Sequence, residues 1–335
     1  MRGAILRRRA PMFRLVDWTG LSPKERGETI ALDVADGDPP RDPAYIRTLR
    51  RTGYPFASYT GLYAVRDGQL CSRVVVIRLS FTDSKGTRPV TGIADVVTLP
   101  EWAGRGLATR LLKGVHRREQ RAGQRWSFLW THPSWRAHGV YEKLGYRDVY
   151  SPPVAVRRLP NRRTRELPPG YHSRPARASD EPLLSRLLEG SRTSRVGFIP
   201  RYRPGAFQVQ FLSGWRRPEQ HHILYHRSKP VGYAFTYSGP RTLYSAEVVV
   251  DSPIHEDAAI DLIEQVAGRD WVVICRTTFV QDARKLLEER GYRTFHEVHL
   301  TLMARPLIRV GRPEQDRMWS LFTDPRFSCH GGDMF

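Results

Sequence analysis

Length and composition limit the class of protein. The chain has 335 residues, 40% of them hydrophobic, and a mean hydropathy of −0.49, which predicts two domains with buried cores. No apolar run approaches the roughly 20 residues that a transmembrane helix needs. The basic N-terminus lacks the apolar stretch of a secretory signal. We therefore expect a cytoplasmic protein with no membrane partner; its oligomeric state, a homo-oligomer included, is left open.

The net charge is strongly positive. Lys and Arg number 54 against 34 Asp and Glu, which gives a formal charge of +20 and a pI near 10.5. Nucleic acid, an anionic cofactor or an acidic substrate would each be attracted by this charge. The excess is nearly all arginine spread along the chain, as a compositional bias would also give.

Cysteine and histidine do not indicate a metal centre. Cys71, Cys275 and Cys329 are scattered and form neither a disulfide framework nor a CxxC pair. The eleven histidines show no ligand spacing. We expect no metal.

One order of predicted elements occurs twice. Each half has two strands around a polar turn, a β-branched strand, a helix and an apolar strand. The strands fall at 62–65, 70–81, 90–99 and 126–131, and again at 223–226, 231–237, 243–251 and 271–277. This matching order indicates an internal duplication.

The helix that closes each half repeats as well. Residues 141–146 read YEKLGY and residues 287–292 read LEERGY, with Gly145 and Gly291 where a left-handed C-cap is expected. A strand follows each helix, at 148–159 and at 297–304. We therefore predict domains at 1–159 and 171–305, a Pro- and Arg-rich linker at 160–170, and a C-terminal tail at 306–335 that docks on the protein.

The strongest local signal is VVTLPEWAGRGLATRLL at residues 96–112. A buried strand stops at Pro100, and a turn with Gly104 and Gly106 opens a helix. Such a turn exposes backbone N–H groups at the positive end of a helix dipole, and glycine lets an anion approach closely. The loop predicts an anion site that suits a diphosphate, with Arg105 adding charge. Neither a Walker pattern nor a complete dinucleotide fingerprint is present.

The same segment resembles motif A of the GCN5-related N-acetyltransferase (GNAT) superfamily, R/Q-x-x-G-x-G/A, which falls on residues 103–108 with Ala103 in the first position. AHGVYEKLGY at residues 137–146 resembles a second family segment. The resemblance implies an α/β fold: two tandem GNAT-like domains, each a central twisted mixed sheet flanked by helices. It also implies acetyl-CoA or a related acyl-CoA as co-substrate, and a small-molecule or peptide amine as acceptor.

The resemblance also assigns the site. Backbone groups of the strand before the loop would hold the pantetheine arm, and the loop would hold the pyrophosphate. The cofactor residues so implied are Val96, Val97, Thr98, Gly104, Arg105, Gly106, Leu107, Ala108, Thr109 and Ser134, the last standing where the family often has Asn.

Two groups would carry the proton transfers. Tyr141 matches the family's general acid, and a phenol with a pKa near 10 stays protonated at neutral pH, ready for a departing thiolate. Asp95 is a candidate base. The chain is also similar to the enhanced-intracellular-survival acetyltransferases, tandem GNAT enzymes that use the carboxylate of a C-terminal Phe as base. That similarity implies the same role for Phe335, with His330 and Asp333 nearby.

The second half lacks these features. Its counterpart of the loop, DSPIHEDAA at 251–259, has no glycine and carries Glu256 and Asp257, which would repel a diphosphate, and Leu287 stands at the position of Tyr141. We therefore expect a scaffold. Two alternatives stay open: an acyltransferase that acts on tRNA or aminoacyl-tRNA, suggested by the arginine clusters, and a module that binds acyl-CoA without turnover.

Overall fold

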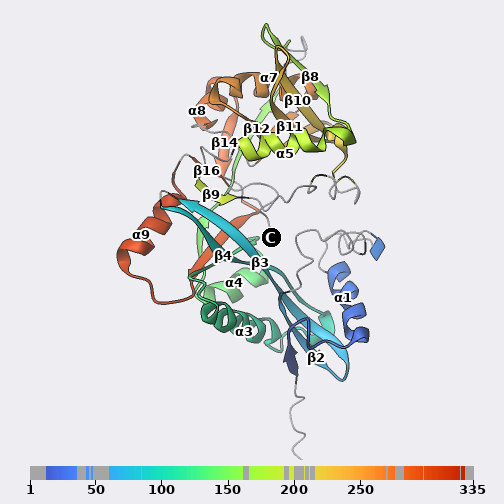
Figure 1. The fold of residues 1–335 in the computed structure, drawn as a ribbon, viewed down its shortest axis with the longest axis vertical. Coiled ribbons are helices and arrows are strands. Elements are labelled where there is room, and N and C mark those ends of the chain that lie inside the picture. Colours follow the sequence, from blue (N-terminus) through green and yellow to red (C-terminus); the bar gives the residue numbers. More distant parts are fainter. Residues whose placement is uncertain are drawn as a thin grey trace, which may run out of the picture. The chain divides into compact units, whose positions relative to one another are not determined.

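A computed structural model describes most of the chain (Figure 1). The described residues are 13–35, 43, 44, 47, 60–83, 85–160, 166–191, 196–199, 207, 211, 216–268, 271–275, 283–296, 298–324 and 326–328. They form two compact units, Met1–Ile77 with Ile93–Gly123, and Arg78–Gly92 with Gln124–Phe335. No helix in the described part of the chain is long and apolar enough to cross a bilayer.

The first unit is built on an antiparallel meander. Strand β1 pairs with β2, and β2 pairs with β3, with an irregularity between Ala64 and Val65. Helices α1 and α3 complete the unit. Its elements are β1 (Arg14–Val16), α1 (Pro23–Ala35), β2 (Leu62–Arg66), β3 (Gln69–Asp83), β4 (Gly86–Thr98), η2 (Pro100–Trp102) and α3 (Leu107–Arg121), of which β3 and β4 continue into the other unit.

A small core fixes α1 on the meander. It consists of Leu21, Leu32, Tyr63, Val65, Leu70 and Val97, all at most 7% exposed. Alternation along β2 turns Tyr63 and Val65 to this side. The core therefore joins α1 to the end of β4, which leads into the glycine turn.

In the second unit, the two halves of the chain exchange strands. Strand β15 lies between β5 and β6 and is antiparallel to both. Strand β7 pairs antiparallel with β13 and β14. The sequence predicted a single strand at 148–159 and another at 297–304, each closing its own half. The structure instead divides the first into β6 and β7, and it has an additional strand, β14, before the second, β15; β7 and β15 each join the other half's sheet.

The remaining elements of this unit follow in chain order. They are β5 (Trp126–Thr131), α4 (Arg136–Lys143), β6 (Arg147–Tyr150), β7 (Pro153–Arg158), β8 (Tyr171–Pro175), η3 (Ala178–Asp180), α5 (Glu181–Gly190), β9 (Val196–Ile199), η5 (Pro218–Gln220), β10 (His221–His226), β11 (Lys229–Gly239), β12 (Thr242–Val250), η6 (Pro253–His255), α7 (Glu256–Ala267), β13 (Trp271–Cys275), α8 (Ala283–Glu289), β14 (Arg293–His296), β15 (Thr301–Pro306), α9 (Arg312–Leu321) and β16 (Phe327–Ser328).

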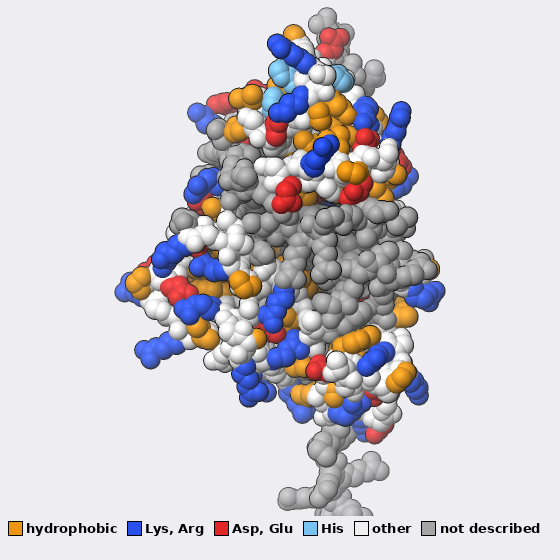
Figure 2. All heavy atoms as spheres, in the orientation of Figure 1, with side chains coloured by type: hydrophobic (Ala, Val, Ile, Leu, Met, Phe, Trp, Pro, Cys, Tyr) orange, Lys and Arg blue, Asp and Glu red, His pale blue; other side chains and the backbone are white. Residues whose placement is uncertain are grey.

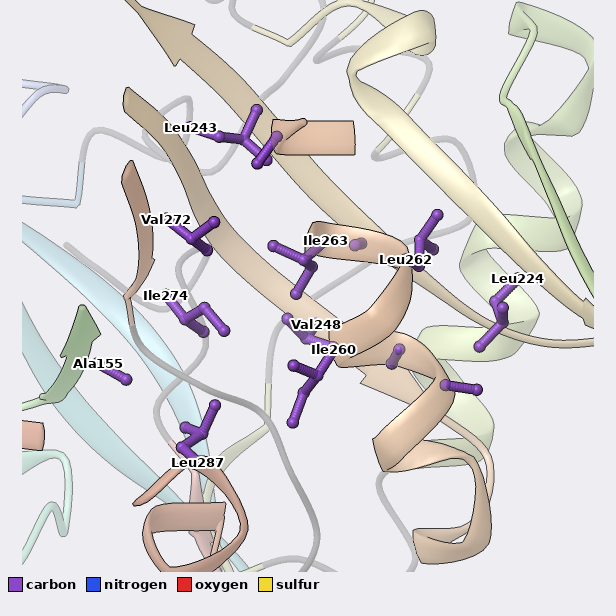
Figure 3. Close-up of a cluster of buried hydrophobic side chains, with 14 of the residues drawn as sticks. Ala155, Leu224, Leu243, Val248, Ile260, Leu262, Ile263, Val272, Ile274 and Leu287 are labelled. Carbon is purple, nitrogen blue, oxygen red and sulfur yellow. The ribbon is translucent and has the colours of Figure 1, made fainter. Parts of the chain in front are cut away.

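The sheet ordered β14-β7-β13-β12-β11-β10-β8, here called the second sheet, is covered on both faces. Ile260 and Ile263 of α7 pack on Val248 of β12 and Val272 of β13 (Figure 3). On the opposite face, α5 packs with Val249. Neighbouring valines of β12 thus point to opposite cores, which explains why the end of this strand, residues 248–250, is apolar without alternation.

The repeated helix ends are confirmed. Gly145 and Gly291 have φ angles of 87° and 82°, in the left-handed region. The amides of Tyr146 and Tyr292 bond to the carbonyl oxygens of Tyr141 and Leu287, at 3.1 and 2.9 Å. The chain has a mixed α/β fold in which the predicted duplication is present, with the strand exchange added to it.

The C-terminal segment docks on the protein, as the sequence predicted, at least as far as Ser328. Trp319 of α9 meets Trp126 edge to face at a centroid distance of 5.3 Å, and Phe322 contacts Phe327 at 5.1 Å. Strand β16 then pairs parallel with β9. Phe335, His330 and Asp333 lie outside the described residues.

Next to Arg216 and Glu247, the second sheet buries a neutral histidine. His221 is fully buried, with the ring of Phe235 at a centroid distance of 4.8 Å. Burial, reinforced by the charge of Arg216, lowers the pKa of His221 to about 4. Because this pKa is depressed in the folded state, the unfolded chain binds the proton first as the pH falls below 6.5.

We therefore expect stability to fall between pH 6.5 and pH 4, with His221 accounting for up to about 3 kcal/mol of unfolding free energy. Urea titrations across this range measure it. His221→Gln, which cannot titrate, should be less stable at pH 7 but lose less on acidification. His172→Gln, at an exposed position, is the control and should keep the wild-type slope. Equal slopes in all three proteins would contradict the assignment.

Candidate functional site

The turn between β4 and α3 has the predicted geometry. After η2, Gly104 and Gly106 have φ angles of 75° and 70°. Gly106 is the N-cap of α3, which begins at Leu107. Two left-handed residues this close together reverse the chain sharply, and only glycine takes this conformation at little cost. The glycines are therefore required by the backbone of the turn itself.

The turn is open on its outer side. An added Cβ at Gly104 or Gly106 would meet no atom within 4 Å, and residues 103–106 are exposed. The first N–H groups of an α-helix have no partner within the helix, and no side chain caps α3. The amides of Leu107, Ala108 and Thr109 thus begin a helix at an accessible turn. An anion fits this arrangement.

A tryptophan organises two arginines beside the turn. The guanidinium of Arg105 lies 4.8 Å from the ring centroid of Trp102, and that of Arg66 lies 5.0 Å from it. The ring of Phe13 meets Trp102 edge to face at 5.7 Å. Arg105 also donates to the carbonyl oxygen of Glu101 at 3.3 Å. Sequence reasoning identified Arg105 but missed Arg66, because the β2–β3 turn reaches the loop only through the fold.

Just before the turn, β4 contains a residue in an unfavourable conformation. Asp95 has a φ angle of 43°, although it lies within a strand. Its carboxylate lies 3.2 Å from the guanidinium of Arg73, which also binds Asp33 of α1. The candidate base predicted from the sequence is thus part of an ion-paired cluster in the first unit.

The predicted pantetheine-binding segment, 96–98, is fixed from β3. The hydroxyl of Ser72 donates to the carbonyl oxygen of Val97 and bonds to the hydroxyl of Thr98, both at 2.8 Å. The amide of Leu99 donates to the carbonyl oxygen of Cys71 at 3.0 Å. The backbone of this segment is therefore held in one position up to the turn.

Tyr141, the predicted acid, lies on α4 and is 6% exposed. Its ring contacts Tyr146 edge to face at 6.1 Å. The hydroxyl of Tyr146 bonds to Ser127 at 2.7 Å, and burial raises the pKa of Tyr146 well above its usual value. Of these two neighbouring phenols, Tyr146 is therefore held as a neutral structural group.

Ser134 belongs to a polar cluster at the start of α4. Its amide and hydroxyl contact Nδ1 of His132 at 3.1 and 2.8 Å, and Nε2 of His132 faces His299 at 3.0 Å. Nearby in the sequence, Nε2 of His138 lies 3.1 Å from both carboxylate oxygens of Asp148. These contacts fix the segment that precedes Tyr141.

The structure brings some of the predicted residues together. Asp95–Thr98 and Gly104–Thr109 belong to the first compact unit, whereas Tyr141 and Ser134 belong to the second. Phe335 lies outside the described residues. Within the first unit, the loop, the strand before it and the arginine pair on Trp102 form one continuous feature.

Comparison with known proteins identifies this part of the chain. Residues 40–149 match the family model of the acetyltransferase (GNAT) domain. This segment is similar to that domain. No curated protein sequence matched the chain.

Solved structures share the fold of nearly the whole chain. A GCN5-related N-acetyltransferase from Kribbella flavida is 19% identical over 88% of this chain and 72% of its own, with a TM-score of 0.61. Eis1 from Mycobacterium abscessus is 17% identical over 88% and 74%, with a TM-score of 0.59. A tandem GNAT protein from the clavulanic acid biosynthesis pathway is 9% identical over 90% and 100%, with a TM-score of 0.51. The second sheet thus completes a tandem GNAT fold.

The second GNAT-like half has a different loop after its corresponding strand. Strand β12 leads through η6 directly into α7, without a left-handed glycine among residues 251–256. In the first turns of α7, Asp257 and Asp261 bind Arg290 at 2.9 and 2.8 Å. Acidic side chains at a helix N-terminus interact favourably with the helix dipole, and they repel an anion that would bind there.

Proposed function

We propose that the protein is an acyl-CoA-dependent N-acyltransferase that moves an acetyl group from acetyl-CoA to an amine. The observation that carries this proposal is the open, uncapped turn of Gly104 and Gly106 at the start of α3, within the segment that matches the GNAT domain. Its amides supply donors for the pyrophosphate, and Arg105 supplies positive charge. Residues 96–98 would hold the pantetheine arm by backbone hydrogen bonds.

The chemistry follows from the thioester. A neutral amine attacks the carbonyl carbon, the C–S bond breaks, and the thiolate takes a proton from the phenol of Tyr141. The amine nitrogen loses its extra proton to a base. We assign the base to the carboxylate of Phe335 rather than to Asp95, the other candidate from the sequence. The second GNAT-like half is a scaffold in this proposal, because its loop lacks the glycine turn.

The acceptor is a small-molecule or peptide amine in this proposal. Figure 2 shows Lys and Arg side chains interspersed with hydrophobic and neutral ones over the described surface on the visible face. Such a distribution does not single out a nucleic-acid track. RNA that survives a moderate-salt wash on the purified protein would favour the RNA-directed alternative. Binding of acetyl-CoA without thiol release from any amine panel would favour a non-catalytic module.

Gly106→Ala should raise the Kd for coenzyme A by at least about tenfold, since losing a charge-assisted hydrogen bond costs roughly 1.5–3 kcal/mol. The new Cβ strains the left-handed turn and occupies the space in front of the amides. Isothermal titration calorimetry measures the affinity.

Gly123→Ala is the matched control for this variant. Gly123 has a φ angle of 77° and also has open space around an added Cβ, but it lies at the other end of α3. It should lose roughly 1 kcal/mol of stability through the same backbone strain and keep the wild-type affinity. An absence of coenzyme A binding by the wild type, or equal affinities in the two variants, would overturn the cofactor assignment.

Tyr141→Phe should lower kcat by about 100-fold while leaving the Kd for coenzyme A unchanged, because only the proton donor is removed. Thiol release from acetyl-CoA in the presence of an accepted amine measures the rate. Tyr146→Phe removes a hydroxyl from the neighbouring ring and should cost about 1 kcal/mol of stability with little effect on kcat. If the two variants lose the same activity, Tyr141 is not the acid.

A further inference from the structure

We propose that Asp95 is a positioning residue, held by Arg73, that fixes the irregular backbone from which the acyl-CoA-binding segment departs. This inference rests on the proposed function. It gives Asp95 a role different from that of the general base, and it assigns a role to Arg73 and Asp33, which the sequence did not single out.

The first observation is the backbone of Asp95. A non-glycine residue in the left-handed region is strained and persists only where its surroundings hold it. Asp95 has this conformation in the interior of β4, three residues before the strand ends at Thr98. A change of φ here redirects every residue that follows. The direction of 96–98, and of the turn beyond, therefore depends on this one residue.

The second observation is the clamp on its side chain. Arg73 is 1% exposed, and its guanidinium lies 3.2 Å from Asp95 while it also binds Asp33. A buried guanidinium cannot leave its carboxylates without a large desolvation cost. Since Asp33 ties Arg73 to α1, the position of Arg73 is fixed from a second element. Arg73 in turn holds the Asp95 side chain, and with it the strained backbone of Asp95.

Consecutive residues of β3 extend this hold toward the loop. Cys71 accepts from the amide of Leu99, Ser72 bonds to Val97 and Thr98, and Arg73 binds Asp95. Residues 71–73 thus fix the end of β4 from the irregularity to the turn. Arg73 is the member of this series that acts at the irregularity itself.

The second sheet carries an ion-paired acid at the corresponding position. Residues 94–97 read ADVV, and residues 246–249 at the corresponding strand read AEVV. Glu247 is fully buried, accepts from Arg216 at 2.7 Å and binds the hydroxyl of Tyr233. The acid is therefore present, buried and clamped in the half whose loop lacks glycine.

This second acid also lies beside a strand irregularity. Phe235 is opposite Glu247 and Thr236 is opposite Ser245, so that Ala246 is an extra residue in β12. An ion-paired acid at a backbone irregularity in both halves, a positive φ at Asp95 and a bulge beside Glu247, with a glycine turn in only one half, points to a role in shaping the strand. A base would be needed only where the reaction occurs.

Substitutions at Asp95 test the proposal, because they leave Arg73 paired with Asp33 and create no uncompensated pair of buried acids. Asn retains the shape and tolerates the left-handed region, Gly adopts it freely, and Ala does neither. Calorimetry with coenzyme A and initial rates with acetyl-CoA give Kd and kcat. If Asp95 is a positioning residue, Asp95→Asn should keep both Kd and kcat within about threefold of the wild-type values. Asp95→Ala should raise the Kd for coenzyme A by about tenfold, and Asp95→Gly should recover most of that lost affinity.

Gly123→Ala, the control used above, also serves as the control for strain alone. It places a Cβ in the left-handed region at the far end of α3, so it should lower stability without changing Kd. Loss of about 100-fold in kcat by Asp95→Asn at unchanged Kd would show a base and overturn the proposal. An Asp95→Gly variant as weak as Asp95→Ala would overturn it as well. A wild-type protein that does not bind coenzyme A would remove the proposed function and this inference together.

Discussion

A positive charge buried at Arg73 is the constraint on which the candidate site depends. With 1% of its surface exposed, the guanidinium must be balanced by carboxylates nearby, and it takes one from α1 and one from β4. Each contact locates a different element, and together they locate the strand end that leads to the glycine turn. The turn itself has open space around it. The strand end behind the turn is therefore held in place, while the turn itself is accessible. Backbone recognition of an extended, anionic cofactor requires this arrangement.

The chain has two similar halves, and they differ in the loop that follows the corresponding strand of each. One keeps left-handed glycines before α3, whereas the other begins α7 with acids paired to Arg290. Both retain an acid paired with an arginine in the strand before the loop, and both end a helix with a left-handed glycine. What the halves share is thus the packing of strands and helices, and what differs is the capacity to receive an anion at a helix start.

Much of the fold followed from the sequence, because local patterns determine it. Gly104 and Gly106 marked the turn, Gly145 and Gly291 marked helix ends, and β5 was predicted with its observed limits, 126–131. The strand exchange was not predictable in this way, since β7 and β15 are short apolar strands whose pattern says nothing about which sheet they join. Arg66 and Arg73 were missed for a related reason: each reaches its partner across the fold, and an isolated arginine in a chain this basic gives no signal. The roles of Asp95, Tyr141 and Phe335 stay predictions.

The exchange of β7 and β15 has a consequence for synthesis of the protein. Strand β5 cannot acquire its neighbour β15 until the ribosome has passed Pro306, a delay on the order of ten seconds at ordinary elongation rates. During that interval the edge of β5 that β15 will cover has unpaired backbone groups and an apolar surface, which is a situation that favours aggregation. We therefore expect the nascent chain to bind a chaperone during this interval. A fragment that ends near residue 159 would leave the edge of β5 uncovered permanently.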